Sequence, residues 1–215
     1  LDAARDIDQI NTAKDALADA GQKVDLPLHF GFLMYWKVIG PFDNIGRDGF
    51  DKVYPPEKEV DFTKSYPGKE GKVKWSDYKT ADTYGMVDIN EPYGHLKEVV
   101  AYAHHTYDSP KAHTAEIRLG CKNAWKIWLN GKLVFERDEY HRGMRIDQYT
   151  LPINLQKGKN KILIKLCQNE QKEDWTDQWQ FQLRICDATG TAILADNRLP
   201  TPQPKAPTRR PKKKG

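Results

Sequence analysis

Two polar segments of the chain each place an aromatic ring beside side chains that form hydrogen bonds. Tyr140 stands two residues before Arg142, and Trp175 lies in a polar stretch that also contains Asn169 and Gln178. An aromatic ring can pack against the apolar C–H face of a sugar, while amide and guanidinium groups bond to its hydroxyls. These five residues therefore predict a carbohydrate-binding site, provided that the two segments lie close together.

The strands predicted between these two segments permit that proximity. Alternating apolar and polar residues predict strands at 149–155 and 162–166, with a Lys157-Gly158 turn between them. In an antiparallel sandwich, alternate connections fall at the same end of the molecule. Two intervening strands therefore allow both polar segments to lie at one end.

A structural role for the same residues is the alternative. Loop aromatics often close the ends of sandwiches, so Trp175 would cap the core. Arg142 would then pair with Asp138 or Asp147. The two interpretations differ in whether Trp175 and the Tyr140 loop are exposed together.

A second candidate site lies in a segment rich in Gly and Asp. Asp43, Asn44, Asp48 and Asp51 offer the hard oxygen ligands that calcium prefers. Their spacing does not match an EF-hand loop, and Asp and Asn also hold turns by bonds to the backbone. We therefore expect these residues to hold turns and predict no cofactor, with calcium bound by this loop as the alternative.

The histidines and cysteines do not predict a metal site. His104 and His105 are neighbours on a predicted strand, so they point to opposite faces and cannot both reach one ion. Cys121, Cys167 and Cys186 are an odd number without CxxC spacing, which excludes a disulfide scaffold and argues against zinc. One disulfide with a free thiol, or three free thiols, both remain open.

Motifs of the common enzyme classes are absent from the sequence. The three serines, Ser65, Ser76 and Ser109, lie outside any G-x-S-x-G string, and no P-loop or Rossmann glycine pattern occurs. A carboxylate pair for glycoside hydrolysis stays open, because Asp and Glu are abundant. We therefore expect a protein that is not an enzyme, with catalysis as a third interpretation after two non-catalytic ones.

Period-two alternation predicts an all-β domain over most of the chain. Asn130-Gly131 stands between two apolar runs, which is typical of a type I′ hairpin. On its first strand Trp125 faces the core, and Trp128 faces outward beneath a loop or the helix. Strands are predicted at 32–39 (ended by Gly40-Pro41), 73–75, 86–89, 99–107, 115–121, 125–135 (the hairpin), 149–155, 162–166 and 179–185.

The ends of the chain differ in composition from this middle part. Apolar residues recur at three- and four-residue steps over 1–22, which predicts a helix. The last residues are rich in Pro, Lys and Arg, which is typical of disorder. We divide the chain into a helix and linker (1–31), a β-sandwich domain (32–198) and a disordered tail (199–215).

The charge of the chain resides largely in that tail. The formal net charge is +4, but residues 205–215 carry six Lys and Arg residues and no acid, so the rest is slightly negative. This distribution gives no support to a specific nucleic-acid-binding fold. The tail is interpreted as a linker to a following domain, with non-specific contact to nucleic acid, an anionic polymer or a membrane surface as the alternative. No apolar run is long enough to span a membrane.

Four strings of the sequence resemble a known superfamily. They are WKVIGPFDN with GFDKVYPPE within 36–57, IRLGCKNAWKIWLNGKLVFE at 117–136, LQKGKNKILIKLCQ at 155–168 and WQFQLRICDATG at 179–190. In this order and spacing they are similar to the galactose-binding-like, jelly-roll β-sandwich modules, including sugar-binding domains appended to glycoside hydrolases. Many relatives carry two acidic residues where this chain has Lys122-Asn123, which puts a ligand role for that turn in doubt.

The resemblance implies a non-catalytic, carbohydrate-binding-like module of a larger secreted multidomain protein. Its partners would be a glycan or polysaccharide and the neighbouring domains of that protein. Its place would be extracellular, periplasmic or at the cell surface, although the chain begins with Leu1 and carries no signal peptide. The alternative is a structural or protein–protein interaction module without a small ligand.

Overall fold

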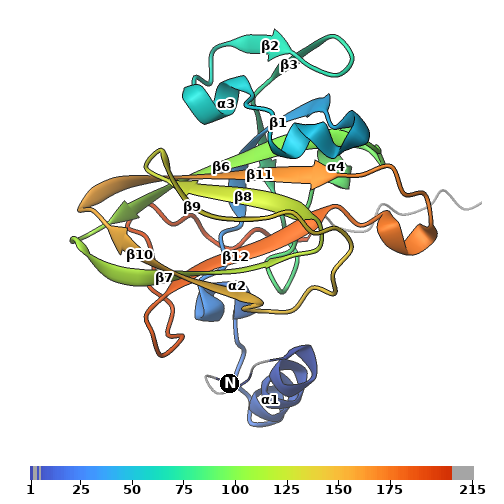
Figure 1. Cartoon of the computed structure of the whole chain (residues 1–215). Helices are drawn as coiled ribbons and strands as arrows, with labels where there is room; N and C mark the ends of the chain where they lie inside the picture. Colours follow the sequence, from blue (N-terminus) through green and yellow to red (C-terminus); the bar gives the residue numbers. More distant parts are fainter. Residues whose placement is uncertain (2–3, 5, 205–215) are drawn as a thin grey trace, which may run out of the picture.

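The computed structural model describes residues 1, 4 and 6–204, and strands dominate it. They are β1 (Tyr35–Asp43), β2 (Ser65–Pro67), β3 (Lys72–Lys74), β4 (Ser76–Lys79), β5 (Val87–Asp88), β6 (Val99–Ser109), β7 (His113–Cys121), β8 (Ala124–Leu129), β9 (Lys132–Arg137), β10 (Tyr149–Leu155), β11 (Gly158–Gln168) and β12 (Gln180–Cys186). A six-stranded sheet, β4-β1-β6-β11-β8-β9, faces a four-stranded sheet, β10-β7-β12-β5 (Figure 1). The predicted antiparallel β-sandwich is confirmed.

Apolar side chains that alternate along the strands fill the space between the two sheets. On β11, Ile162, Ile164 and Leu166 are fully buried in this main core. Trp125 of β8 and Trp179, next to β12, are its largest fully buried side chains. Because each buried aromatic removes roughly 150–250 Å² from water, these two rings contribute much of the sandwich's stability. The prediction that Trp125 is a core residue is confirmed.

The hairpin β8–β9 forms as the Asn-Gly pair predicts. Asn130 and Gly131 have φ values of 53° and 80°, the positive φ that a type I′ turn requires at both central residues. The Asn130 side chain also accepts a bond from the backbone N–H of Lys161 at 2.8 Å. The turn is thereby fixed to the neighbouring strand β11.

Strand β1 continues beyond Gly40-Pro41, where the sequence predicts its end, and terminates at Asp43. That predicted boundary is wrong because the β1–β6 pairing shifts register between Ile39 and Phe42. Such an irregularity accommodates Pro41, which has no N–H for the ladder. The strand therefore delivers Asp43 directly into a loop at the end of the sandwich.

A third layer covers the outer face of the six-stranded sheet (Figure 1). It consists of the segment between β1 and β4, with the two-stranded sheet β2-β3. A second core lies beneath it, against which Trp128 packs half-buried, as the outward orientation predicted. The helices of this layer are η1 (Ile45–Phe50), a 3-10 element, and α3 (Pro55–Lys58).

A buried ion pair fixes the third layer to the sheet. Lys165 of β11 is fully buried, and its Nζ lies 2.9 Å from Oε1 of Glu57 in α3. The same ammonium donates to the carbonyl oxygens of Phe50 and Lys52, each at 2.8 Å. Three partners satisfy the three N–H groups of the lysine, which is the condition under which a buried charge is tolerated.

The predicted N-terminal helix is present as α1 (Ile7–Asp19). Its N-cap is Asp6, whose side chain accepts from the N–H of Gln9 at 2.9 Å. A short helix α2 (Leu26–Phe30) follows, and Ile10 and Phe30 lie in one small core beside the sandwich. The other helices are α4 (Asn90–Tyr93) and the 3-10 element η2 (Asp174–Thr176).

Part of the predicted tail lies outside the described residues, which end at Pro204. Residues 199–204 are described, and the Pro200 carbonyl accepts a bond from the Tyr35 hydroxyl at 2.8 Å. The domain boundaries at 31 and 198 stay predictions. Among the described residues, no helix has the length and hydropathy needed to cross a membrane.

Candidate functional site

The two polar segments that the sequence singles out meet at one end of the sandwich. His141 Nε2 lies 2.7 Å from Asn169 Oδ1, in the loop after β11. The His141 ring also packs edge-on against the Trp175 indole, with ring centroids 5.4 Å apart. The loop between β9 and β10 thus touches the loop between β11 and β12, as the count of two intervening strands predicts.

A third loop, η1 and its flanking residues, joins these two. Arg47 donates to both carboxylate oxygens of Glu170, from Nε at 3.1 Å and from Nη2 at 2.5 Å. Its guanidinium carbon lies 5.2 Å from the centroid of the Tyr140 ring, a cation–π distance. We call this three-loop surface the loop end; its residues are Arg47, Tyr140, His141, Arg142, Glu170 and Trp175.

Trp175 stands out from the loop end instead of closing the core. Its side chain is 59% exposed, whereas the neighbouring Trp179 is fully buried. The alternative in which Trp175 caps the core is therefore wrong, and Trp179 fills that place. The exposed indole leaves an aromatic face open to contact from outside.

The other predicted sugar ligands divide between supporting and exposed positions. Asn169 is fully buried and uses its amide to hold His141 and Gln171. Tyr140 is half-buried, and its hydroxyl accepts from Nδ2 of Asn44 at 3.1 Å. Burial raises the pKa of Tyr140, so the phenol stays neutral. The side chains of these two residues connect the loops to one another.

Arg142 and Gln178 are exposed and have partners that the sequence did not predict. Arg142 Nε lies 2.9 Å from Glu139, and neither Asp138 nor Asp147 is its partner. Gln178 accepts a bond from the ammonium of Lys122. Asp147 instead binds two guanidinium groups, that of half-buried Arg118 and that of buried Arg184.

The charge of the loop end is balanced. Burial lowers the pKa of His141, and the nearby Lys97 and Arg47 lower it further, against the opposing effect of the Asn169 bond. The imidazole is therefore neutral at neutral pH. The hydrogen bonds from Arg47 lower the pKa of Glu170 and keep it ionised.

The sequence patterns did not identify Arg47, His141 or Glu170 as candidate site residues, although His141 lies between two residues that they did identify, Tyr140 and Arg142.

The four predicted calcium ligands do not converge. Asp43 Oδ1 lies 3.4 Å from Lys69, and Asp51 Oδ1 lies 3.3 Å from Lys126. Asn44 is buried, with one oxygen, Oδ1, that has no hydrogen-bond partner among the described residues. In that part of the chain, no group of three or more His, Cys, Asp or Glu side chains is arranged to hold a metal. Calcium binding, with Asp48 included, stays a prediction.

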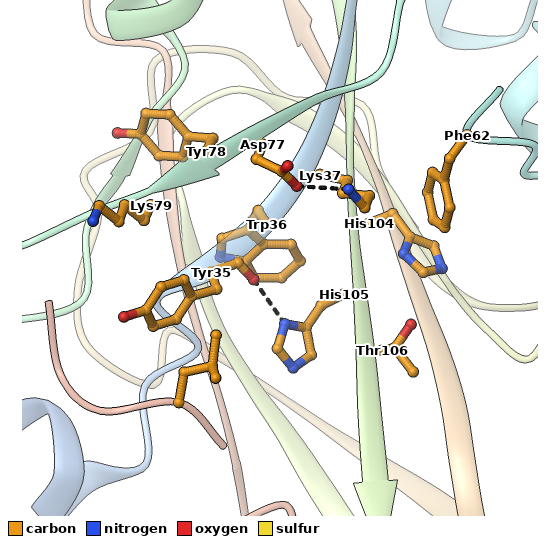
Figure 2. A pocket seen from close by; sticks show the side chains of 11 residues that line it. Tyr35, Trp36, Lys37, Phe62, Asp77, Tyr78, Lys79, His104, His105 and Thr106 are labelled. Atoms are coloured by element: carbon orange, nitrogen blue, oxygen red, sulfur yellow. Dashed lines mark hydrogen bonds and ion pairs between the residues drawn. The ribbon is translucent and has the colours of Figure 1, made fainter. Parts of the chain in front are cut away.

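A cavity of about 520 Å³ lies away from the loop end, beside the edge strand β4 (Figure 2). Strand pairing sets Asp77 of β4, Lys37 of β1 and His104 of β6 in one cross-strand row, and cross-strand partners share a face. Lys37 Nζ and Asp77 Oδ1 are 2.6 Å apart. Figure 2 shows Tyr35 and Phe62 on opposite sides of this space, which we call the side pocket.

The two histidines predicted to face opposite sides of one strand do so. His104 packs on the Phe62 ring at 5.1 Å, on the outer face, whereas His105 packs on Trp36 at 5.5 Å. Burial lowers the pKa of His104 to about 4 and also lowers that of His105. Both imidazoles are therefore neutral at neutral pH.

The cysteines are thiols without disulfide bonds. Cys121, Cys167 and Cys186 are all buried and free. Burial raises the pKa of Cys121 and of Cys167 to about 12. Of the two alternatives that the sequence left open, three free thiols is the one present.

Comparison with known proteins gives structural neighbours but no family. No family model matches the chain, and no curated protein matches its sequence. A GH2 β-galacturonidase from Eisenbergiella tayi is similar over 71% of this chain and 23% of its own, at 9% identity and TM-score 0.43. A β-glucosidase from Kluyveromyces marxianus is similar over 80% of this chain and 21% of its own, at 11% identity and TM-score 0.42.

A third solved structure, a PA14 sugar-binding domain from an RTX adhesin, is similar over 85% of this chain and 77% of its own, at 15% identity and TM-score 0.29. The chain spans about a fifth of the two enzymes. At these TM-scores and identities, the likeness is limited to the general form of the fold.

Proposed function

We propose that this chain is a non-catalytic carbohydrate-binding module, and that the loop end is where it binds a glycan. The observation that carries the proposal is the exposed indole of Trp175, held edge-on against His141. An indole face in water can pack against the C–H face of a sugar ring.

The indole belongs to a pre-organised surface. His141 cannot turn freely, because its Nε2 is bonded to the buried Asn169. The adjoining loop is fixed by the backbone bond from Arg142 N–H to the Lys122 carbonyl at 3.0 Å. Rigid side chains lose little conformational entropy on binding, which favours affinity for a small ligand on an open surface.

Polar groups around the indole supply partners for sugar hydroxyls. The Arg47–Glu170 and Arg142–Glu139 pairs orient guanidinium and carboxylate groups at this surface while leaving further donor and acceptor sites open. Stacking and a few hydrogen bonds on an open surface correspond to dissociation constants of roughly millimolar to micromolar. In this proposal the module serves a larger, secreted multidomain protein by holding it near a polysaccharide.

The test is retention of the full chain on immobilised polysaccharides, with Trp175→Ala and Trp175→Ala/Arg142→Ala as variants. We expect each variant to lose retention while its melting temperature stays close to that of the parent. Phe62→Ala is a matched control, because Phe62 is also an exposed aromatic, 42% exposed, but lies at the side pocket. It should leave retention unchanged.

Two results would contradict the proposal. One is a parent chain that no polysaccharide retains across a broad glycan screen. The other is equal loss of retention in the Phe62 and Trp175 variants, which would indicate non-specific adsorption of aromatic rings. Either result would favour the alternative, a structural or protein–protein interaction module.

A further inference from the structure

The side pocket has the dimensions of a small-molecule site. Its volume of about 520 Å³ falls within the range of roughly 300–1,000 Å³ that is usual for ligand pockets. Its floor consists of three hydrogen-bonded strands, β4, β1 and β6. A pocket with such a floor is preformed, because the strand register fixes the positions of its side chains.

Two large apolar side chains stand exposed at the side pocket. Phe62 comes from the third layer, and Leu199, 54% exposed, comes from the segment after β12. The bond from the Tyr35 hydroxyl to the Pro200 carbonyl holds Leu199 in place. Exposed apolar side chains around a hollow are typical of ligand sites.

Aromatic rings line the space from three different elements. Tyr35 lies on β1, His104 on β6 and Phe62 in the third layer. Phe62 meets His104 at an interplanar angle of 71°. A flat aromatic ring between such groups can adopt the offset and edge-on contacts that aromatic pairs prefer.

The side pocket also carries one unpaired positive charge. Lys37 and Asp77 neutralise each other, and the two pocket histidines are neutral. Lys79 lies two residues after Asp77 on β4, hence on the same face of the strand. Its ammonium has no ion-pair partner within the described part of the chain, so it is free to bind an anion at the pocket.

We propose that the side pocket binds a small aromatic carboxylate, with its ring between Tyr35 and Phe62 and its carboxylate at Lys79. This site is separate from the loop end and does not depend on glycan binding there. It would give the module a second ligand of a different chemical class.

The experiment is calorimetric titration of the full chain with naphthoate, and with naphthylmethanol as the neutral counterpart. We expect naphthoate to bind more tightly than the alcohol. Lys79→Met should weaken naphthoate about threefold, the effect of losing one exposed ion pair, and leave the alcohol unaffected. Phe62→Ala should weaken both probes about tenfold, through lost ring contact and apolar burial.

Two controls make the outcome decisive. Lys74→Met removes an exposed lysine of β3 that does not line the side pocket, and Trp175→Ala removes the exposed ring of the loop end. Both should leave naphthoate binding unchanged. The proposal is overturned if naphthoate does not bind, if the alcohol binds equally well, or if Trp175→Ala weakens binding more than Phe62→Ala does.

Discussion

The loop end and the side pocket are built from different parts of the fold. At the loop end, side chains from three loops hold one another, as in the Arg47–Glu170 pair and the His141–Asn169 bond. At the side pocket, backbone pairing between β4, β1 and β6 places the floor, and side chains add little to its geometry. The loop end therefore presents a ring outward on a polar surface, whereas the side pocket encloses apolar space on a fixed sheet.

Both regions depend on the third layer, which supplies Arg47 to one and Phe62 to the other. Removing its buried anchor with Lys165→Ala should destabilise the protein strongly and affect both regions at once. The change leaves the mostly buried carboxylate of Glu57 without its cation, and breaking a buried pair in this way costs about 3–5 kcal/mol. Urea unfolding measures the loss, and both ligand-binding activities should weaken together.

Lys161→Ala is the control for that substitution. Lys161 lies on the same strand but is exposed, so its removal should change the free energy of unfolding by less than about 0.5 kcal/mol. Equal effects of the two substitutions would show that the Lys165–Glu57 pair does not anchor the third layer.

Lowering the pH should destabilise the two regions to different extents, through protonation of His104 at the side pocket and of His141 at the loop end. Unfolded histidine binds a proton below about pH 6.5, whereas folded His104 stays neutral down to about pH 4. The stability that His104 contributes is complete above its unfolded pKa and is lost as the pH falls toward its folded pKa. The loss amounts to about 3 kcal/mol over that window.

The corresponding variants are His104→Phe and His141→Asn. His104→Phe should flatten the fall in unfolding free energy between about pH 7 and about pH 4. The pKa of His141 is also lowered, but this side chain is only partly buried, so His141→Asn should flatten the curve much less. A larger effect from His141 would mean that the loop end is the more tightly packed of the two regions.

Removing one aromatic ring from the loop end and one from the main core compares an exposed side chain with a buried one. Trp175→Ala should reduce the free energy of unfolding by less than about 1 kcal/mol, because this indole is mostly in water. Trp179→Ala should cost about 3–5 kcal/mol, because it empties part of the main core. Thermal unfolding distinguishes them, and a large loss for Trp175→Ala would mean that it packs on the body after all.

The difference between the regions also explains how far the sequence could predict them. Loop composition revealed Trp175, Arg142 and Asn169, and counting strands was enough to place their loops at one end. Composition could not tell that Asn169 is buried as a support, because its burial depends on the His141 and Gln171 contacts. Nor could it tell which acid would pair with Arg142, since that depends on the path of the loop.

No short segment of the sequence indicates the side pocket. Its residues come from β1, β4, β6, the third layer and the segment at Leu199, which are far apart in the chain. Alternation at 99–107 did predict that His104 and His105 face opposite sides. It could not show that Phe62 would pack on one of them, because that contact requires the third layer to fold over the sheet.

The smallest expected effect concerns calcium at the loop that leads into η1. Excess calcium or a chelator should leave the melting temperature unchanged. A ligand raises the melting temperature only when it binds the native state, and we expect no calcium to bind here. The reason is geometric: Asp43 lies at Lys69 and Asp51 at Lys126, so two of the four predicted ligands already face cations. Among the described residues, Asp43 Oδ1 and Asn44 Oδ1 are buried without a hydrogen-bond partner, and two oxygens are too few for an ion that takes six to eight. A rise with calcium that Asp48→Asn abolishes would reverse this conclusion and make the loop end a metal-dependent surface.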